Sequence, residues 1–237
     1  MSLQACSSAN RETDDSLATL TVLLEQVPAL VRPFHPQLTR TFVKSTTDTA
    51  AISVRTRAAA GLGELMKHQP RVDPLVTELV GLVRSSEKDV QPSVLNALGA
   101  VCTSAGKNIG AAVKSSVVEL VEEAFAEGRG ETYNKAVGTV VAGLAASDPE
   151  SIRPIVETFL AAPTPPTMAT SIVILAILEQ APSTFHQLGI VEDVIKKVQA
   201  SVSLDSSAIA RPAREAREIM RSDYAWKEDE SAQALLK

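Results

Sequence analysis

The stretch Arg57-Ala-Ala-Ala-Gly-Leu-Gly-Glu-Leu65 has a close counterpart in Ser93-Val-Leu-Asn-Ala-Leu-Gly-Ala-Val101. Looser counterparts lie at residues 135–143 and 171–178, so the pattern recurs at offsets of about 36 to 42 residues. Arrays of stacked two-helix repeats have periods in this range. We therefore expect a chain of consecutive helical hairpins. The alternative is an irregular helical bundle whose alanine-rich helices resemble one another by composition alone.

Apolar residues have helical spacing along nearly the whole chain. Between Leu17 and Val27 they follow the i, i+3, i+4, i+7 pattern of an amphipathic helix. Proline, glycine and short polar clusters separate segments of roughly three to five turns. Neighbouring hairpins must stack, because one hairpin cannot bury its own apolar face. The sequence predicts an all-α fold, a HEAT/armadillo-type α-α superhelix (solenoid) of about five to six helical hairpins.

The two ends of the chain are more polar than its middle. Residues 1–13 are expected to form a disordered leader, and the first three residues are typical of an expression scar. Residues 14–223 are expected to form the HEAT-repeat array, and residues 224–237 a polar C-terminal tail. The polar ends suggest a segment of a longer chain.

The overall composition argues against several classes of protein. The chain has 23 basic and 28 acidic residues, whereas a general nucleic-acid binder needs a net basic surface. The two cysteines, Cys6 and Cys102, lack the spacing of a disulfide framework or a zinc site. No secretory signal is found, and no apolar segment approaches the roughly 20 residues of a membrane span. We expect a reduced, cytoplasmic protein without a membrane contact.

Residues that could carry out chemistry are not grouped in the sequence. It contains no G-x-S-x-G, H-E-x-x-H or Walker motif, and Gly61-Leu-Gly63 lies inside a predicted helix. The histidines His35, His68 and His186 fall in different repeats and share no metal-ligand spacing. We expect a non-enzymatic protein with no catalytic residue, metal site, cofactor or small-molecule substrate.

A local surplus of basic residues is the most informative feature of the charge pattern. Residues 31–71 contain seven Lys or Arg against two Asp or Glu. The second helix of each hairpin lines the partner-binding surface in solenoids of this class, and arginine can bind a carboxylate through two parallel hydrogen bonds. We expect this region to bind an acidic partner protein. The candidate partner-binding residues are Arg40, Lys44, Arg55, Arg57, Lys67 and Arg71.

Two of these candidates, Arg55 and Arg57, stand near the start of a predicted small-residue helix. Positive charge at that end opposes the helix dipole and brings no helical benefit. One interpretation is that these arginines contact the partner. The other is that an arginine here is simply solvated, or forms a ladder between neighbouring repeats.

Three strings in the first half of the chain resemble one family. They are Arg32-Pro-Phe-His-Pro-Gln-Leu-Thr-Arg-Thr-Phe-Val-Lys44, Val54-Arg-Thr-Arg-Ala-Ala-Ala-Gly-Leu-Gly-Glu-Leu65 and Arg71-Val-Asp-Pro-Leu-Val-Thr-Glu-Leu79. They look like the carboxy-terminal region of the general-control activators of the initiation factor 2α kinase, very long HEAT-repeat proteins of eukaryotic translation control. The resemblance covers about residues 30 to 105, and its discriminating pieces are the Pro-Phe-x-Pro-Gln-Leu and Val-Asp-Pro-Leu strings.

The resemblance implies a scaffold that associates with ribosomes and activates the kinase in the amino-acid starvation response. It implies that the RWD domain of the kinase docks on this region, and that an arginine takes part; by motif, Arg55 and Arg57 are the two candidates. Two other functions stay open. The basic region could contact the ribosome or its RNA, or the chain could be a generic HEAT-repeat scaffold of the phosphatase or transport-receptor type.

Overall fold

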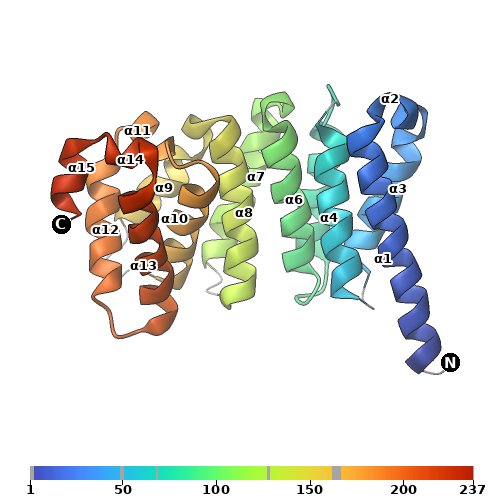
Figure 1. Ribbon diagram of the computed structural model, residues 1–237, viewed down its shortest axis with the longest axis horizontal. Coiled ribbons are helices and arrows are strands. Elements are labelled where there is room, and N and C mark those ends of the chain that lie inside the picture. Colours follow the sequence, from blue (N-terminus) through green and yellow to red (C-terminus); the bar gives the residue numbers. More distant parts are fainter. Residues whose placement is uncertain (1–2, 49–50, 68, 127–128, 162–166, 237) are drawn as a thin grey trace. The chain divides into compact units, whose positions relative to one another are not determined.

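The computed structural model describes residues 3–48, 51–67, 69–126, 129–161 and 167–236, with the backbone alone for residues 3–11 (Figure 1). Helices are the only regular secondary structure in these ranges. The predicted all-α helical-repeat fold is therefore confirmed. The chain divides into two compact units, Met1–Val113 and Lys114–Lys237. The boundary between them falls in the first turn of the helix α7 (Ala111–Ala126).

The first unit is built from two helical hairpins and a preceding helix. Helices α1, α4 and α6 lie side by side in one layer, while α3 packs on α4 and α5 packs on α6 (Figure 1). The two similar sequence stretches, at residues 57–65 and 93–101, fall in α4 and α6. The helices are α1 (Leu3–Gln26), α2 (Pro28–Val31), α3 (His35–Thr46), α4 (Ile52–Met66), α5 (Asp73–Ser85) and α6 (Gln91–Ala105), with 3-10 turns η1 (Arg32–Phe34) and η2 (Gly106–Asn108).

Small residues let α4 approach both of its neighbours closely. Gly61 lies against the fully buried ring of Phe42 in α3, where a Cβ atom would overlap the ring. On the other side, a Cβ atom on Gly63 would come within 3.0 Å of the Cβ atom of Ala100 in α6. Side-chain size at the contact sets the distance between packed helices. The glycine-alanine pattern in the repeat therefore reflects close packing on two sides of α4.

The second unit repeats this arrangement. Helices α8, α10 and α13 lie next to one another, and α12 packs on α13. The rings of Phe125 in α7 and Phe159 in α9 meet edge to face, with centroids 4.5 Å apart. The elements are α8 (Glu131–Ser147), η3 (Pro149–Ile152), α9 (Arg153–Ala161), α10 (Met168–Gln180), α11 (Thr184–Leu188), α12 (Val191–Val202), α13 (Ser207–Ser222), α14 (Tyr224–Lys227) and α15 (Glu230–Leu235).

The beginning of the chain differs from the expected disordered leader. Helix α1 begins at Leu3, so residues 3–13 continue the helix that buries Leu17 and Leu24. No proline or glycine interrupts residues 3–26. The polar composition of residues 3–13 therefore does not mark a helix boundary.

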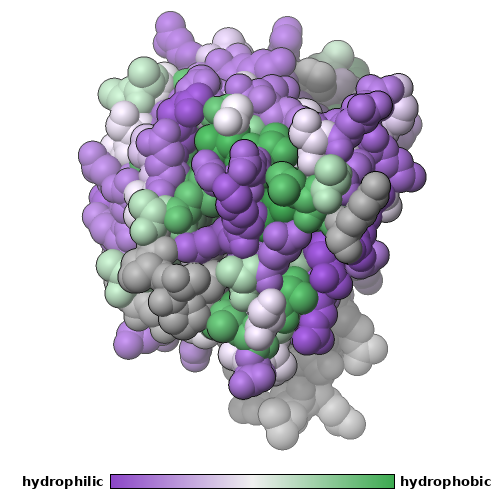
Figure 2. Space-filling view, turned by 90° about the vertical axis from the view of Figure 1, so that its left-hand side faces the viewer, coloured by the Kyte–Doolittle hydropathy of each residue, from purple (hydrophilic) through white to green (hydrophobic). Residues whose placement is uncertain are grey.

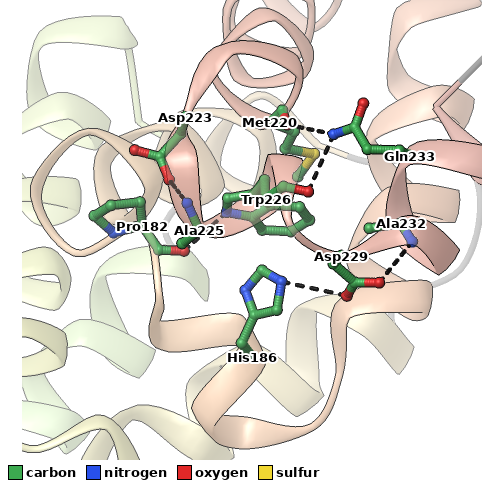
Figure 3. Close-up of polar contacts among 9 residues, drawn as sticks. All are labelled: Pro182, His186, Met220, Asp223, Ala225, Trp226, Asp229, Ala232 and Gln233. Carbon is green, nitrogen blue, oxygen red and sulfur yellow. Dashed lines mark hydrogen bonds and ion pairs between the residues drawn. The ribbon is translucent and has the colours of Figure 1, made fainter.

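The C-terminal segment, which was expected to be a polar tail, packs on other helices of the second unit (Figure 3). Trp226 is fully buried, and its indole N–H donates a hydrogen bond to the carbonyl oxygen of Pro182 at 2.9 Å. His186 lies edge-on to the Trp226 ring, and its Nε2 atom is 3.4 Å from Oδ2 of Asp229. Leu236 is 2% exposed. Trp226, Ala232 and Leu236 are thus buried in a segment whose other residues are mostly polar.

Candidate partner-binding surface

Arg55 is a structural connection between two repeats. Its residue is only 7% exposed. The Nε atom donates a hydrogen bond to Oγ of Ser93 in α6 at 2.9 Å, and Nη1 donates to the carbonyl oxygen of Asp48 at 2.6 Å. Its guanidinium thereby joins the start of α4 to the next hairpin. This is the ladder arrangement that the sequence left open for an arginine at this place.

Arg57 has a different environment, although it is only two residues further along α4. Its side chain is 47% exposed, and its Nε atom lies 2.8 Å from Oδ1 of Asp14 in α1. The pair is only half exposed, because the Asp14 side chain itself is 17% exposed. A guanidinium has five N–H donors, so an incoming carboxylate can bind Arg57 beside Asp14 without replacing it. Among the two candidate arginines, Arg57 is the accessible one.

Arg57 belongs to an exposed stripe along α4, which we call the α4 face. Lys67, just after the end of α4, is on the same side and forms an ion pair with Glu64, whose side chain is 12% exposed. Positions three and four residues apart on a helix lie on one side of it. The α4 face consists of Ser53, Arg57, Ala60, Glu64 and Lys67.

Arg40 and Lys44 lie on the opposite side of the first unit. Both are exposed residues of α3, and each is two positions from Phe42, which faces Gly61 of α4. Two helical positions correspond to a rotation of about 200°, so these cations point away from α4. Arg71 is exposed in the connection between α4 and α5.

The structure therefore divides the six predicted residues among four environments. Arg57 and Lys67 share the α4 face, Arg40 and Lys44 share the far side of α3, Arg71 is in a loop, and one arginine is buried. The carboxylates of Asp14 and Glu64, which the sequence did not place at this surface, pair with its two cations. The place of Glu64 at this surface could have been predicted from its i, i+3 spacing to Lys67. The place of Asp14 could not, because it depends on how α1 packs on α4.

The described residues contain no group of three or more His, Cys, Asp or Glu that could hold a metal ion. His35 and His186 lie in different units, and His68 falls outside the described residues. No single described helix is long and apolar enough to cross a membrane; the bent pair Glu12–Gln26 and Pro28–Thr46 passes by length and composition only when taken together. What the α4 face offers chemically is two exposed cations, one on the helix and one just after its end, each paired with a carboxylate.

No protein-family model matches the chain. Curated proteins match slightly less than half of it. Over 108 residues, which are 45% of the chain, it is 47% identical to the eIF-2-alpha kinase activator GCN1 of Saccharomyces cerevisiae. Within the matched part, this chain is a homologue of the GCN1 proteins.

Other GCN1 relatives come from distant organisms. The chain is 39% identical over 106 residues to the stalled ribosome sensor GCN1 of Homo sapiens, and 36% identical over 107 residues to Protein ILITYHIA of Arabidopsis thaliana. It spans 4% of the length of each of these relatives. The family resemblance found in the sequence is confirmed, while the place of this segment within the longer proteins stays a prediction.

Proposed function

We propose that this chain is a segment of a non-enzymatic, cytoplasmic scaffold of translation control, and that its α4 face binds the RWD domain of the initiation factor 2α kinase. The partner would present carboxylates to Arg57 and Lys67. Through this contact the scaffold would activate the kinase in the amino-acid starvation response.

The accessibility of Arg57 is the observation that carries this proposal. The yeast relative is named a kinase activator, and an activator must contact its kinase or something bound to it. Arginine is suited to a carboxylate-bearing partner because its planar guanidinium can donate two parallel hydrogen bonds. The α4 face holds such a guanidinium on a helix that is packed on three neighbours, α1, α3 and α6. A rigid support reduces the entropy lost when the complex forms.

Charge reversal at Arg57 tests the proposal. The Arg57→Glu variant should bind the isolated RWD domain of the kinase at least about tenfold more weakly than the wild type, because it replaces an attraction with a repulsion. Isothermal titration calorimetry with the purified domain measures this change. The wild-type affinity should also decrease with added salt, since salt screens exposed charges.

The matched control for this experiment is Arg40→Glu. It makes the same charge change on an exposed residue, but on the far side of α3. We expect its affinity to stay within about twofold of the wild type, apart from a general effect of net charge. Equal weakening by both variants would show that overall charge and not the α4 face determines binding. No binding by the wild type would leave the generic scaffold as the better description.

A ribosomal partner is the second candidate, and the human relative, a stalled ribosome sensor, favours it. The same exposed cations would then contact phosphates, since the chain is poor in the aromatic residues on which bases stack, at 3%. Binding to RNA would fall steeply with salt and would not need the RWD domain. A gel-shift assay at low salt that shows no complex with ribosomal RNA would remove this candidate for the segment.

A further inference from the structure

A groove of about 390 Å³ lies on the second unit, between α8, α10 and α13. Its apolar part is formed by Ile172, Leu175 and Ala176 of α10 and by Pro212 of α13. Ile172 and Ala176 are 4% and 8% exposed, while Leu175 is half-buried and reaches further toward solvent. The volume is at the lower end of the range for binding pockets. It has room for one or two side chains of a peptide.

The two cations at the edge of the groove are already paired. Glu131 of α8 forms ion pairs with Lys135, at 2.9 Å, and with Arg211 of α13. The hydrogen bond from Lys135, together with the charge of Arg211, holds the pKa of Glu131 below its ordinary value. One carboxylate engages both cations, so these three side chains largely neutralise one another at the edge of the groove.

Of the remaining polar side chains at the groove, Thr139 and Gln180 can both donate and accept hydrogen bonds, and the two others are carboxylates. Glu179 and Glu215 are exposed, and neither forms an ion pair with any described side chain. Pro212 lies inside α13 and has no N–H, so it cannot donate the usual helical hydrogen bond to the carbonyl oxygen of Ala208, another residue of the groove wall. Two carboxylates are thus available to the donors of a ligand, close to a carbonyl that lacks its usual helical donor.

The charge of the second unit has the same sign as these free groups. Residues 114–237 contain 12 Lys or Arg against 18 Asp or Glu, which gives a formal charge of −6. Summed charge of this kind attracts oppositely charged ligands and accelerates their encounter. Both the local acceptors and the field of the unit therefore favour a cationic ligand.

We propose that the groove between α8, α10 and α13 binds a short basic peptide segment of a partner protein. A leucine-sized side chain of the segment lies on Leu175, Ala176 and Pro212. Neighbouring lysine or arginine side chains reach Glu179 and Glu215. This site is in the second unit and does not depend on the α4 face, so it can be present whether or not the RWD domain binds the first unit.

Fluorescence anisotropy with the whole 237-residue protein and a labelled ten-residue peptide, one leucine among lysines and glycines, tests this site. The peptide should bind, and a version with glutamate in place of lysine should bind at least about tenfold more weakly because the unit repels it. Replacing the leucine by serine should also weaken binding several-fold, since it removes the apolar contact. Equal binding of the leucine and serine peptides would overturn the groove as the site.

Charge reversal in the protein locates the site. The double variant Glu179→Lys, Glu215→Lys should lose at least about tenfold in affinity for the lysine-leucine peptide. The matched control is Glu119→Lys, Glu122→Lys, which makes the same charge change at exposed residues of α7, outside the groove. The control should lose no more than about threefold. Equal losses, preferential binding of the glutamate peptide, or association of two copies through the groove would each contradict the proposal.

Discussion

Arg55 and Arg57 show how two neighbouring residues of one type can have separate roles. They are about 200° apart around α4, so Arg55 turns toward α6 while Arg57 stays on the exposed stripe beside α1. The sequence placed both near the start of a small-residue helix but could not separate them. The separation depends on which side of the helix the next hairpin covers, and that is a property of packing.

The burial of Arg55 predicts a loss of stability when it is removed. Arg55→Ala should lower the free energy of unfolding by about 2–3 kcal/mol, because Ser93 and the carbonyl of Asp48 lose a charged hydrogen-bond partner. Arg57→Ala should cost less, about 1 kcal/mol, because the Arg57 side chain is half exposed and makes one ion pair, with Asp14. Urea denaturation followed by circular dichroism gives both values. Similar losses for the two variants would contradict the assignment of Arg55 as a structural residue.

At the scale of the helices, the sequence predicted the array better than its ends. Recurring small residues such as Gly61 and Gly63 mark α4 because helix contacts demand them at fixed spacing. The C-terminal helices α14 and α15 carry no such repeat. Their packing buries one large side chain, Trp226, together with the smaller Ala232 and Leu236. A single tryptophan in a sequence gives no indication of the cavity that will hold it.

Trp226 should therefore contribute strongly to the stability of the second unit. Trp226→Ala should cost about 3–5 kcal/mol, since it leaves a large cavity and an unpaired carbonyl on Pro182. Tyr224→Ala is the matched control, because this aromatic side chain of the same short helix is 73% exposed and should change stability by about 0.5 kcal/mol or less. Differential scanning calorimetry compares the two. An equally small effect of Trp226→Ala would mean that α14 and α15 do not form part of the folded unit.

At the scale of the whole chain, the two units carry different charge. Residues 1–113 hold 11 Lys or Arg against 10 Asp or Glu, so the first unit is nearly neutral, while the second is acidic. The chain-wide charge of −5 hides this contrast. The basic surplus at residues 31–71 was visible in the sequence, but its division between the α4 face and the far side of α3 was not. Which charged residues share one surface can be decided only when the exposed side of each helix is known.

A photo-crosslinking amino acid placed at single positions tests the docking surface most directly. Ala60 is exposed in the middle of the α4 face, and Gln37 is exposed on the far side of α3. With the RWD domain of the kinase, the chain carrying the crosslinker at position 60 should give a crosslinked complex, and the chain carrying it at position 37 should not. Crosslinking from position 37 and none from position 60 would contradict the assignment of the α4 face.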